Sequence, residues 1–328
     1  MRAPEASLRT RIRRAVERRA PLRADGRTNA VRLVHGRGDG LEGVSVDLFG
    51  DVLVVSLYAE LDPGPLVEAL GAACAPRAVY LKHRPRAASR LAPSALRRRA
   101  PEKPAWGPAV EEVDVLEKGL RFRIRPGEGL AVGLYLDMRE TRDWVRAHAA
   151  STTLLNCFAY TGGFSVAARA GGATSAVNVD LSRRALAWAD ENAALNGQAV
   201  HPGESLAGDV VHWLGRLARA GRRFSTVVLD PPSFSRGPSG PFSVSRDMPE
   251  LVARAAVLLA PGGHLVACCN QESLAPGRFL SLVQRGLSQA ARGAAEVARL
   301  TASPVDFPPP PGERPLFRGV VLRLEALG

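Results

Sequence analysis

The sequence is poor in cysteine and contains no long apolar run. Four cysteines occur among 328 residues, Cys74, Cys157, Cys268 and Cys269, and their positions show no metal-ligand spacing. This predicts free thiols in a reducing compartment and no metal site. No apolar stretch is long enough to span a membrane, and the charged start MRAPEASLRTRIRR lacks the apolar core of a secretory signal. We therefore expect a cytoplasmic protein with no membrane partner.

Acidic residues are scarce relative to basic ones. The chain has 32 Asp and Glu against 44 Lys and Arg, which gives a formal net charge of +12. Such an excess suits a polyanionic partner such as RNA. An arginine-rich proteome would raise the isoelectric point of every protein it encodes, so this alternative stays open. Hydrophobic content is 46%, and the length allows one large or two modest domains with a real core.

Residues 153–180 form the most informative stretch. A buried strand is predicted over Leu154–Phe158, a Gly-rich turn at 161–163, and a small-residue helix over Phe164–Ala170. A second strand, Ala176–Val179, ends on Asp180. Glycines allow close approach of a ligand to the backbone, and a carboxylate about twenty residues on can bind a ribose diol. Dehydrogenases, methyltransferases and empty α/β domains all share this pattern.

A second acid follows a later strand and narrows the choice. The apolar run Ser225–Leu229 ends in Asp230-Pro231-Pro232-Ser233-Phe234. Two prolines cannot continue a central strand, so they predict a rigid exit at the carboxyl edge of the sheet, where ligands bind in doubly wound folds. An acid and an aromatic ring on that exit suit the holding of a flat base near a methyl donor. A nicotinamide enzyme has no need of them.

Four segments carry a family resemblance: NCFAYTGGFSVAARAGG, NVDLS, ENAALNG and LDPPSFS. They resemble S-adenosylmethionine-dependent ribosomal RNA large-subunit methyltransferases of the RlmI/RlmK type, and the resemblance covers residues 25–325. It implies an α/β fold, with a seven-stranded Rossmann-like class I methyltransferase sheet and a smaller N-terminal α+β domain. It also implies S-adenosyl-L-methionine as cofactor and a base of large-subunit (23S) ribosomal RNA, or its precursor, as acceptor. A homodimer is one of the oligomeric states left open.

The resemblance also assigns cofactor-binding residues. Arg139 follows Tyr135 and Asp137 in a stretch like the family's YxLDQR, with Met138 in place of glutamine, and would hold the methionine carboxylate. The alternative is that Asp137 caps the following helix and Arg139 lies on its surface. Asp209 would accept a hydrogen bond from the adenine amino group or cap a helix. The full set is Arg139, Asn156, Phe158, Tyr160, Thr161, Gly162, Asp180, Asp209 and Asp230.

The acceptor atom decides which catalytic groups are needed. Enzymes that methylate cytosine C5 attack C6 with a cysteine thiolate, whereas guanine N7 has a free lone pair and needs positioning alone. The RlmI-like enzymes read roughly SCSG after a GG turn and strand, and the RlmK-like enzymes read SNN. Counted from Gly262-Gly263, the RlmI cysteine falls on Asn270, and Cys269 points the other way in a regular strand. We expect guanine N7, with Asp230, Phe234 and Asn270 holding the base. Cytosine C5 with Cys269 as nucleophile is the alternative.

The expected domains follow from composition. Residues 1–24 hold a basic helix with Leu8, Ile12 and Val16 on one face, and its arginines either contact RNA or are solvated. Residues 25–108 form a small α+β domain and a Pro/Arg-rich linker. Residues 109–328 form the methyltransferase domain, with its core at 150–328, in which 233–247 suits a flexible lid. The resemblance also leads us to expect that the PUA RNA-binding domain, often found N-terminal in the family, is absent here.

Three other functions were weighed against this one. An NAD-dependent oxidoreductase is disfavoured because G-x-G-x-x-G is absent and DPPSF is present. A catalytically inactive RNA-binding homologue is disfavoured because Asp180, Asp209 and Asp230 are all present. A small-molecule methyltransferase is weakly disfavoured by the basic helix and linker.

Overall fold

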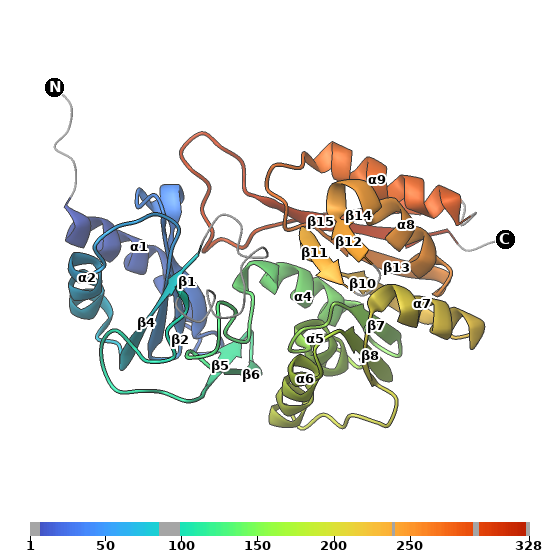
Figure 1. Cartoon of the computed structure of the whole chain (residues 1–328), viewed down its shortest axis with the longest axis horizontal. Coiled ribbons are helices and arrows are strands. Elements are labelled where there is room, and N and C mark those ends of the chain that lie inside the picture. The colour runs from blue at the N-terminus through green and yellow to red at the C-terminus, as the bar shows by residue number, and fades with distance from the viewer. Residues whose placement is uncertain (1–6, 85–98, 238–239, 291–294, 326–328) are drawn as a thin grey trace. The chain divides into compact units, whose positions relative to one another are not determined.

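A computed structural model describes residues 7–84, 99–237, 240–290 and 295–325. Its contacts form two units, Met1–Asp137 together with Pro304–Pro315, and Met138–Ser303 together with Leu316–Gly328 (Figure 1). Each unit has its own sheet. No helix among the described residues combines the length and the apolar character needed to cross a membrane.

The first unit is a four-stranded sheet covered by two helices. Its elements are α1 (Leu8–Arg23), β1 (Ala30–His35), β2 (Val44–Phe49), β3 (Val52–Leu57), α2 (Gly64–Cys74), β4 (Ala78–His83), β5 (Val113–Glu117) and β6 (Leu120–Ile124). The strand order is β1-β2-β3-β4, and β2 and β3 form a hairpin in which Phe49 pairs with Val52 across a two-residue turn. The β5–β6 hairpin, expected in the methyltransferase domain, has its contacts in this unit.

Helix α1 packs through the predicted apolar face. Ile12 is fully buried, and Leu8 and Val16 are partly buried against the same core. Arg19 is also fully buried, which the helical pattern did not predict, and its guanidinium donates to both oxygens of Asp39 at 2.7 Å. The helix is therefore anchored by packing and by a buried ion pair, and not all of its arginines are available to a partner.

The segment 304–315 belongs to the first unit although it joins two strands of the second. Asp306 accepts a hydrogen bond from the backbone N–H of Arg32 at 2.9 Å, and the Phe307 ring lies beneath the Arg32 guanidinium at 4.5 Å. A Cβ at Gly38 would lie 1.9 Å from the carbonyl oxygen of Pro308, so only glycine permits this approach. The predicted proline-rich turn is thus a docked segment with specific contacts.

The second unit is an α/β domain around a seven-stranded sheet. Its elements are α4 (Arg139–Ala147), β7 (Thr153–Cys157), α5 (Gly163–Ala170), β8 (Ser175–Asp180), α6 (Arg183–Leu195), β9 (Ser205–Ala207), α7 (Val210–Arg219), β10 (Phe224–Leu229), β11 (Phe234–Gly237), β12 (Gly240–Ser243), α8 (Val244–Ala256), β13 (Leu259–Cys268), α9 (Pro276–Gln289), β14 (Ala295–Ala302) and β15 (Phe317–Leu324).

The sheet order is β14-β15-β13-β10-β7-β8-β9, and β15 is antiparallel to both of its neighbours. This confirms the predicted fold class and its antiparallel last strand. One face of the sheet packs on residues of α7, α8 and α9, and the other packs on α4 and α5. Leu155 and Leu154 point to these two cores respectively, as the alternation of a doubly covered strand requires.

Candidate active site

The carboxyl ends of four parallel strands meet at one edge of the second unit. Cys157 pairs with Val179 on one side and with Leu229 on the other, and Leu229 pairs with Ala267. The residues that follow these positions therefore lie along the same edge. They include half of the predicted site residues: Phe158, Tyr160, Asp180, Asp230, Cys269 and Asn270.

The loop after β7 has an unusual backbone. Phe158 and Tyr160 have φ values of 60° and 48°, and Gly162 has a φ of 75°. For a bulky residue the left-handed region costs about 1–3 kcal/mol, and such strain persists only where the surroundings fix it. Here the backbone N–H of Ala159 donates to Val179 O at 3.0 Å. The ring of Tyr160 lies 6.2 Å from that of Trp188 on α6.

Asp180 ties this loop to the end of β8. One carboxylate oxygen accepts the backbone N–H of Tyr160 and the other accepts that of Ser182, both at 2.8 Å. A carboxylate offers about four acceptor positions, so the half-buried group keeps capacity for the two hydroxyls of a ribose. These residues fit a nucleoside that lies across the loop.

Asn156 lies beneath the loop and has no exposed surface. Its amide donates to Asn178 Oδ1 at 3.0 Å and to Ser165 Oγ at 3.3 Å. Asn156 therefore links β7 to β8 and α5, and because it is fully buried it does not face a ligand in this conformation. Sequence reasoning missed Asn178 and Ser165; the available signal was the presence of asparagine in two otherwise apolar strands.

Helix α6 packs closely on the turn at residues 161–163. Asn192 of this helix donates to Thr161 O at 2.9 Å. A Cβ at Gly162 would lie 2.7 Å from the Cβ of Ala189. The close approach of helix α6 is therefore one reason for glycine at position 162, in addition to any ligand that approaches from the other side of the turn. Asn192, also missed from the sequence, fixes the turn from behind.

Asp209 and Arg139 occupy different surroundings. Asp209 is the N-cap of α7, where its Oδ1 accepts the backbone N–H of His212 at 3.1 Å, so the helix-cap interpretation is confirmed and its second oxygen keeps acceptor capacity. Arg139 is 2% exposed, so it is not a surface residue, and no side chain caps α4. The alternative interpretation, in which Asp137 caps α4 and Arg139 lies on its surface, was therefore wrong on both points.

Asp230 and Asn270 form a pair at the tips of β10 and β13. The Asn270 amide donates to Asp230 Oδ1 at 3.1 Å, and Asn270 is exposed whereas Asp230 is half-buried. Phe234 begins β11, close in sequence to this pair. A carboxylate, an amide and an aromatic ring at one edge can bind the polar rim and the flat face of a nucleobase.

The segment after Phe234 has more regular structure than the sequence suggested. Residues 234–237 pair with 240–243 as an antiparallel hairpin, and α8 begins at Val244. The exposed Arg246 pairs with Asp247 at 2.7 Å and donates to Pro241 O at 2.8 Å. Residues 238–239 and the Arg236 side chain lie outside the described part. The described residues form a regular hairpin and the start of α8, and the expectation that 233–247 acts as a flexible lid stays a prediction.

Cys269 lies in the core behind this edge. Its side chain is 1% exposed and joins the cluster that contains Leu265 and Ala267, whereas Cys268 belongs to the cluster on the opposite face. Burial raises the pKa of the Cys269 thiol. The reactive thiolate is therefore disfavoured. Within the described ranges no three His, Cys, Asp or Glu side chains could together hold a metal ion.

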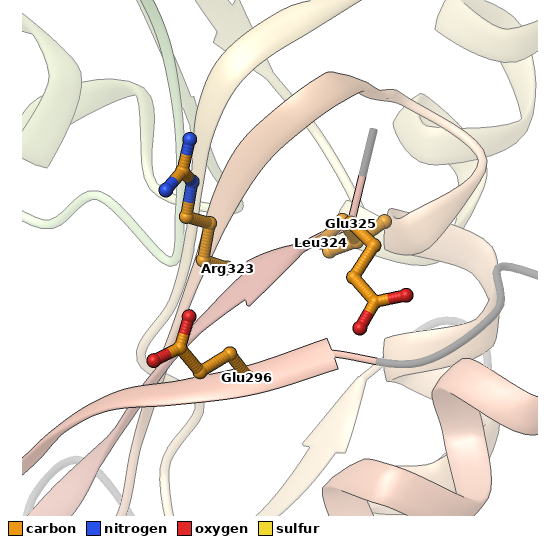
Figure 2. A pocket seen from close by; sticks show the side chains of 4 residues that line it. All are labelled: Glu296, Arg323, Leu324 and Glu325. Atoms are coloured by element: carbon orange, nitrogen blue, oxygen red, sulfur yellow. The ribbon is translucent and has the colours of Figure 1, made fainter. Parts of the chain in front are cut away.

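A polar hollow of about 380 Å³ lies elsewhere on the sheet (Figure 2). It is lined by Glu296, Arg323, Leu324 and Glu325. Arg323 pairs with His264, which in turn pairs with Thr226 near the start of β10. The hollow is therefore at the amino ends of the parallel strands, away from the candidate site.

Comparison with known proteins agrees with this geometry. A family model described as S-adenosylmethionine-dependent methyltransferase matches residues 31–311. The chain is 30% identical over 306 residues to "Ribosomal RNA large subunit methyltransferase I" of Aeromonas salmonicida, covering 91% of this chain and 75% of that protein. It is 33% identical over 292 residues to "Ribosomal RNA large subunit methyltransferase" of Deinococcus radiodurans, covering 86% and 70%. For a Klebsiella pneumoniae relative of the first name the values are 32% over 264 residues, 78% and 64%.

Solved structures share the fold. A methyltransferase-like protein complexed with SAH has a TM-score of 0.87 at 24% identity, covering 98% of this chain and 83% of that one. A SAM-dependent methyltransferase from Agrobacterium tumefaciens has a TM-score of 0.63 at 22% identity, covering 92% and 90%. At these identities the likeness speaks for the fold alone.

Proposed function

The chain belongs to the S-adenosylmethionine-dependent methyltransferase family, and from this premise we propose that it methylates a base of large-subunit ribosomal RNA. Three relatives with 30–33% identity carry that substrate in their names. The net charge of +12 suits a polyanionic acceptor. The chain spans 64–75% of the length of these relatives. Because the chain covers only part of these relatives, the ribosomal RNA acceptor is inferred for it and is not taken from their names.

The cofactor is S-adenosylmethionine, which supplies an activated methyl group when bound. We assign the ribose to Asp180 and the adenine amino group to Asp209, since both carboxylates are half-buried and keep acceptor capacity. The backbone of the loop at 158–162 would form the floor of this site, held by the hydrogen bonds from Tyr160 to Asp180 and from Asn192 to Thr161. Arg139 is buried at the start of α4. It would contact the methionine carboxylate only after a local movement.

Guanine N7 is the acceptor atom that the geometry favours. The single observation that carries this choice is the position of Cys269, whose thiol is buried in the core and has a raised pKa. Cytosine C5 methylation requires a thiolate that reaches the base, whereas N7 has its own lone pair. Methylation at N7 leaves a positive charge on the base, which the nearby Asp230 carboxylate would stabilise. Phe234 would stack on the base, and Asn270 would bind its edge.

The test compares large-subunit RNA from cells with and without this gene by mass-spectrometric nucleoside analysis. We expect loss of 7-methylguanosine, restoration by the wild-type gene and by Cys269→Ala, and no restoration by Asp230→Ala. The Asp230→Ala protein should still bind SAH, which separates a defect in the acceptor site from misfolding. Loss of 5-methylcytidine that Cys269→Ala cannot restore would establish the alternative. An unchanged nucleoside profile would refute a ribosomal RNA acceptor.

A further inference from the structure

Phe158 keeps an aromatic side chain where the backbone favours glycine. Its φ is 60°, a conformation that is rare for bulky residues. We infer that the aromatic ring has a role that a glycine at this position could not fill. Its ring centroid lies 6.5 Å from that of Phe242, at an interplanar angle of 39°. This is within the range of a favourable aromatic pair. Both rings are partly buried against the same hydrophobic cluster.

Phe242 belongs to the same hairpin as Phe234, the ring proposed to stack on the acceptor base. It pairs with Ser235 in the hairpin that begins at Phe234. The backbone N–H of Ser243 donates to Asp247 Oδ2 at 2.7 Å, which ties the second strand to α8. A displacement of Phe242 therefore carries Phe234 with it.

Phe158 is connected in the same way to the cofactor side. Two residues later, the backbone N–H of Tyr160 donates to Asp180. A ribose bound at Asp180 shares this carboxylate with the loop, so cofactor binding fixes the loop conformation. A path therefore runs from the ribose site through Asp180 to the backbone of Tyr160 and along the loop to Phe158. It crosses the ring contact to Phe242 and follows the hairpin to Phe234.

We propose that the contact between Phe158 and Phe242 couples the two sites, so that cofactor binding orders the hairpin and strengthens RNA binding. Phe158 and Phe242 are positioning residues, because they act through the loop and the hairpin. The RNA part of this inference rests on the proposed function. By thermodynamic reciprocity, RNA must raise the affinity for cofactor by the same factor. The energy of one aromatic pair corresponds to about a 2- to 12-fold effect.

The first experiment measures hydrogen exchange of residues 240–243 with and without SAH, in the absence of RNA. We expect SAH to slow exchange in the wild type and in Phe242→Tyr, which keeps the ring. Phe242→Ala and Phe158→Gly should lose this protection. Phe158→Gly removes the ring and relieves the strained backbone, so it keeps the test valid if Phe242→Ala disturbs the hairpin. Equal protection in all four proteins, or none in the wild type, overturns the coupling.

The second experiment measures the affinity for transcribed large-subunit ribosomal RNA, with and without SAH. In the wild type and Phe242→Tyr, SAH should tighten binding about 2- to 12-fold, and in the other two variants the change should disappear. Retention of the full change in Phe242→Ala and Phe158→Gly would refute the coupling. If SAH protects the wild-type hairpin but no protein binds this RNA, the RNA substrate is refuted and the coupling within the protein is supported.

Discussion

Replacement of Gly162 by alanine should damage the cofactor loop through two separable effects. The φ of 75° places the residue in the left-handed region, which costs a non-glycine residue about 1–2 kcal/mol. The new Cβ would lie 2.7 Å from the Cβ of Ala189 and 3.3 Å from its Cα, so helix α6 would have to shift. Overpacking of this kind costs about 1–3 kcal/mol. The sum is a destabilisation of about 2–5 kcal/mol.

Gly197, just beyond the end of α6, provides the matched control. Its φ is 66°, and no heavy atom lies within 4 Å of its ideal Cβ. Gly197→Ala should therefore show the conformational cost alone. In thermal unfolding, the unfolding midpoint of Gly162→Ala should lie below that of Gly197→Ala by about 2–12 °C. Only Gly162→Ala should weaken SAH binding in calorimetric titration. Equal midpoints would refute the steric argument.

Three further predictions concern stability. Arg169→Ala removes the partner of the buried Glu204 carboxylate, 2.8 Å away, and should cost about 3–5 kcal/mol in urea unfolding. Burial raises the pKa of Glu204, but the hydrogen bonds from Arg169, His201 and Ser175 together with the charge of Arg169 outweigh it, and the net pKa is lowered. The contribution of these interactions is therefore present above pH 4.5 and lost as pH falls through the folded value. Burial, and then the charge of His148, lower the pKa of His264 below its ordinary 6.5. The folded protein therefore loses stability as pH decreases from 6.5. In a plot of the thermal unfolding midpoint against pH, His264→Gln should reduce the slope below pH 6.5. Asp306→Ala leaves a backbone N–H of β1 without its acceptor and should cost about 1–3 kcal/mol, measured as faster proteolysis within 304–315.

The sheet edge could be predicted because its signals are local. Asp180 and Asp230 each end a short apolar run, and glycine or proline residues mark the adjacent turns. Parallel strands then bring both carboxylates to one edge without further information. The supporting groups could not be predicted in this way. Asn192 and Ser165 act through contacts with residues 31 and 13 positions away, and nothing in helical periodicity distinguishes them from ordinary buried polar residues.

Two further features depend on tertiary contacts. Arg19 has the pattern of a solvated helical arginine and is buried because Asp39, Arg32 and Asp306 surround its guanidinium. The segment 304–315 has the composition of a turn between strands, yet Asp306 contacts β1 274 positions earlier in the chain, and Phe307 lies beside it. Local propensity carries no information on such distant pairs.

The register of β13 decides which chemistry this edge can support. Residues 264–268 pair with 319–323 without a shift, so Cys269 continues the face of Leu265 and Ala267. The Cys269 thiol could reach the site through a slip of the strand by one residue or through a local bulge. The slip would move that whole face out of its core, at about 1.5–3 kcal/mol for each large apolar side chain. The regular pairing of 264–268 contains no bulge. The residue at the tip is then Asn270, whose amide can bind the edge of a base but cannot attack it. This register supports the proposed guanine N7 acceptor, which carries its own lone pair.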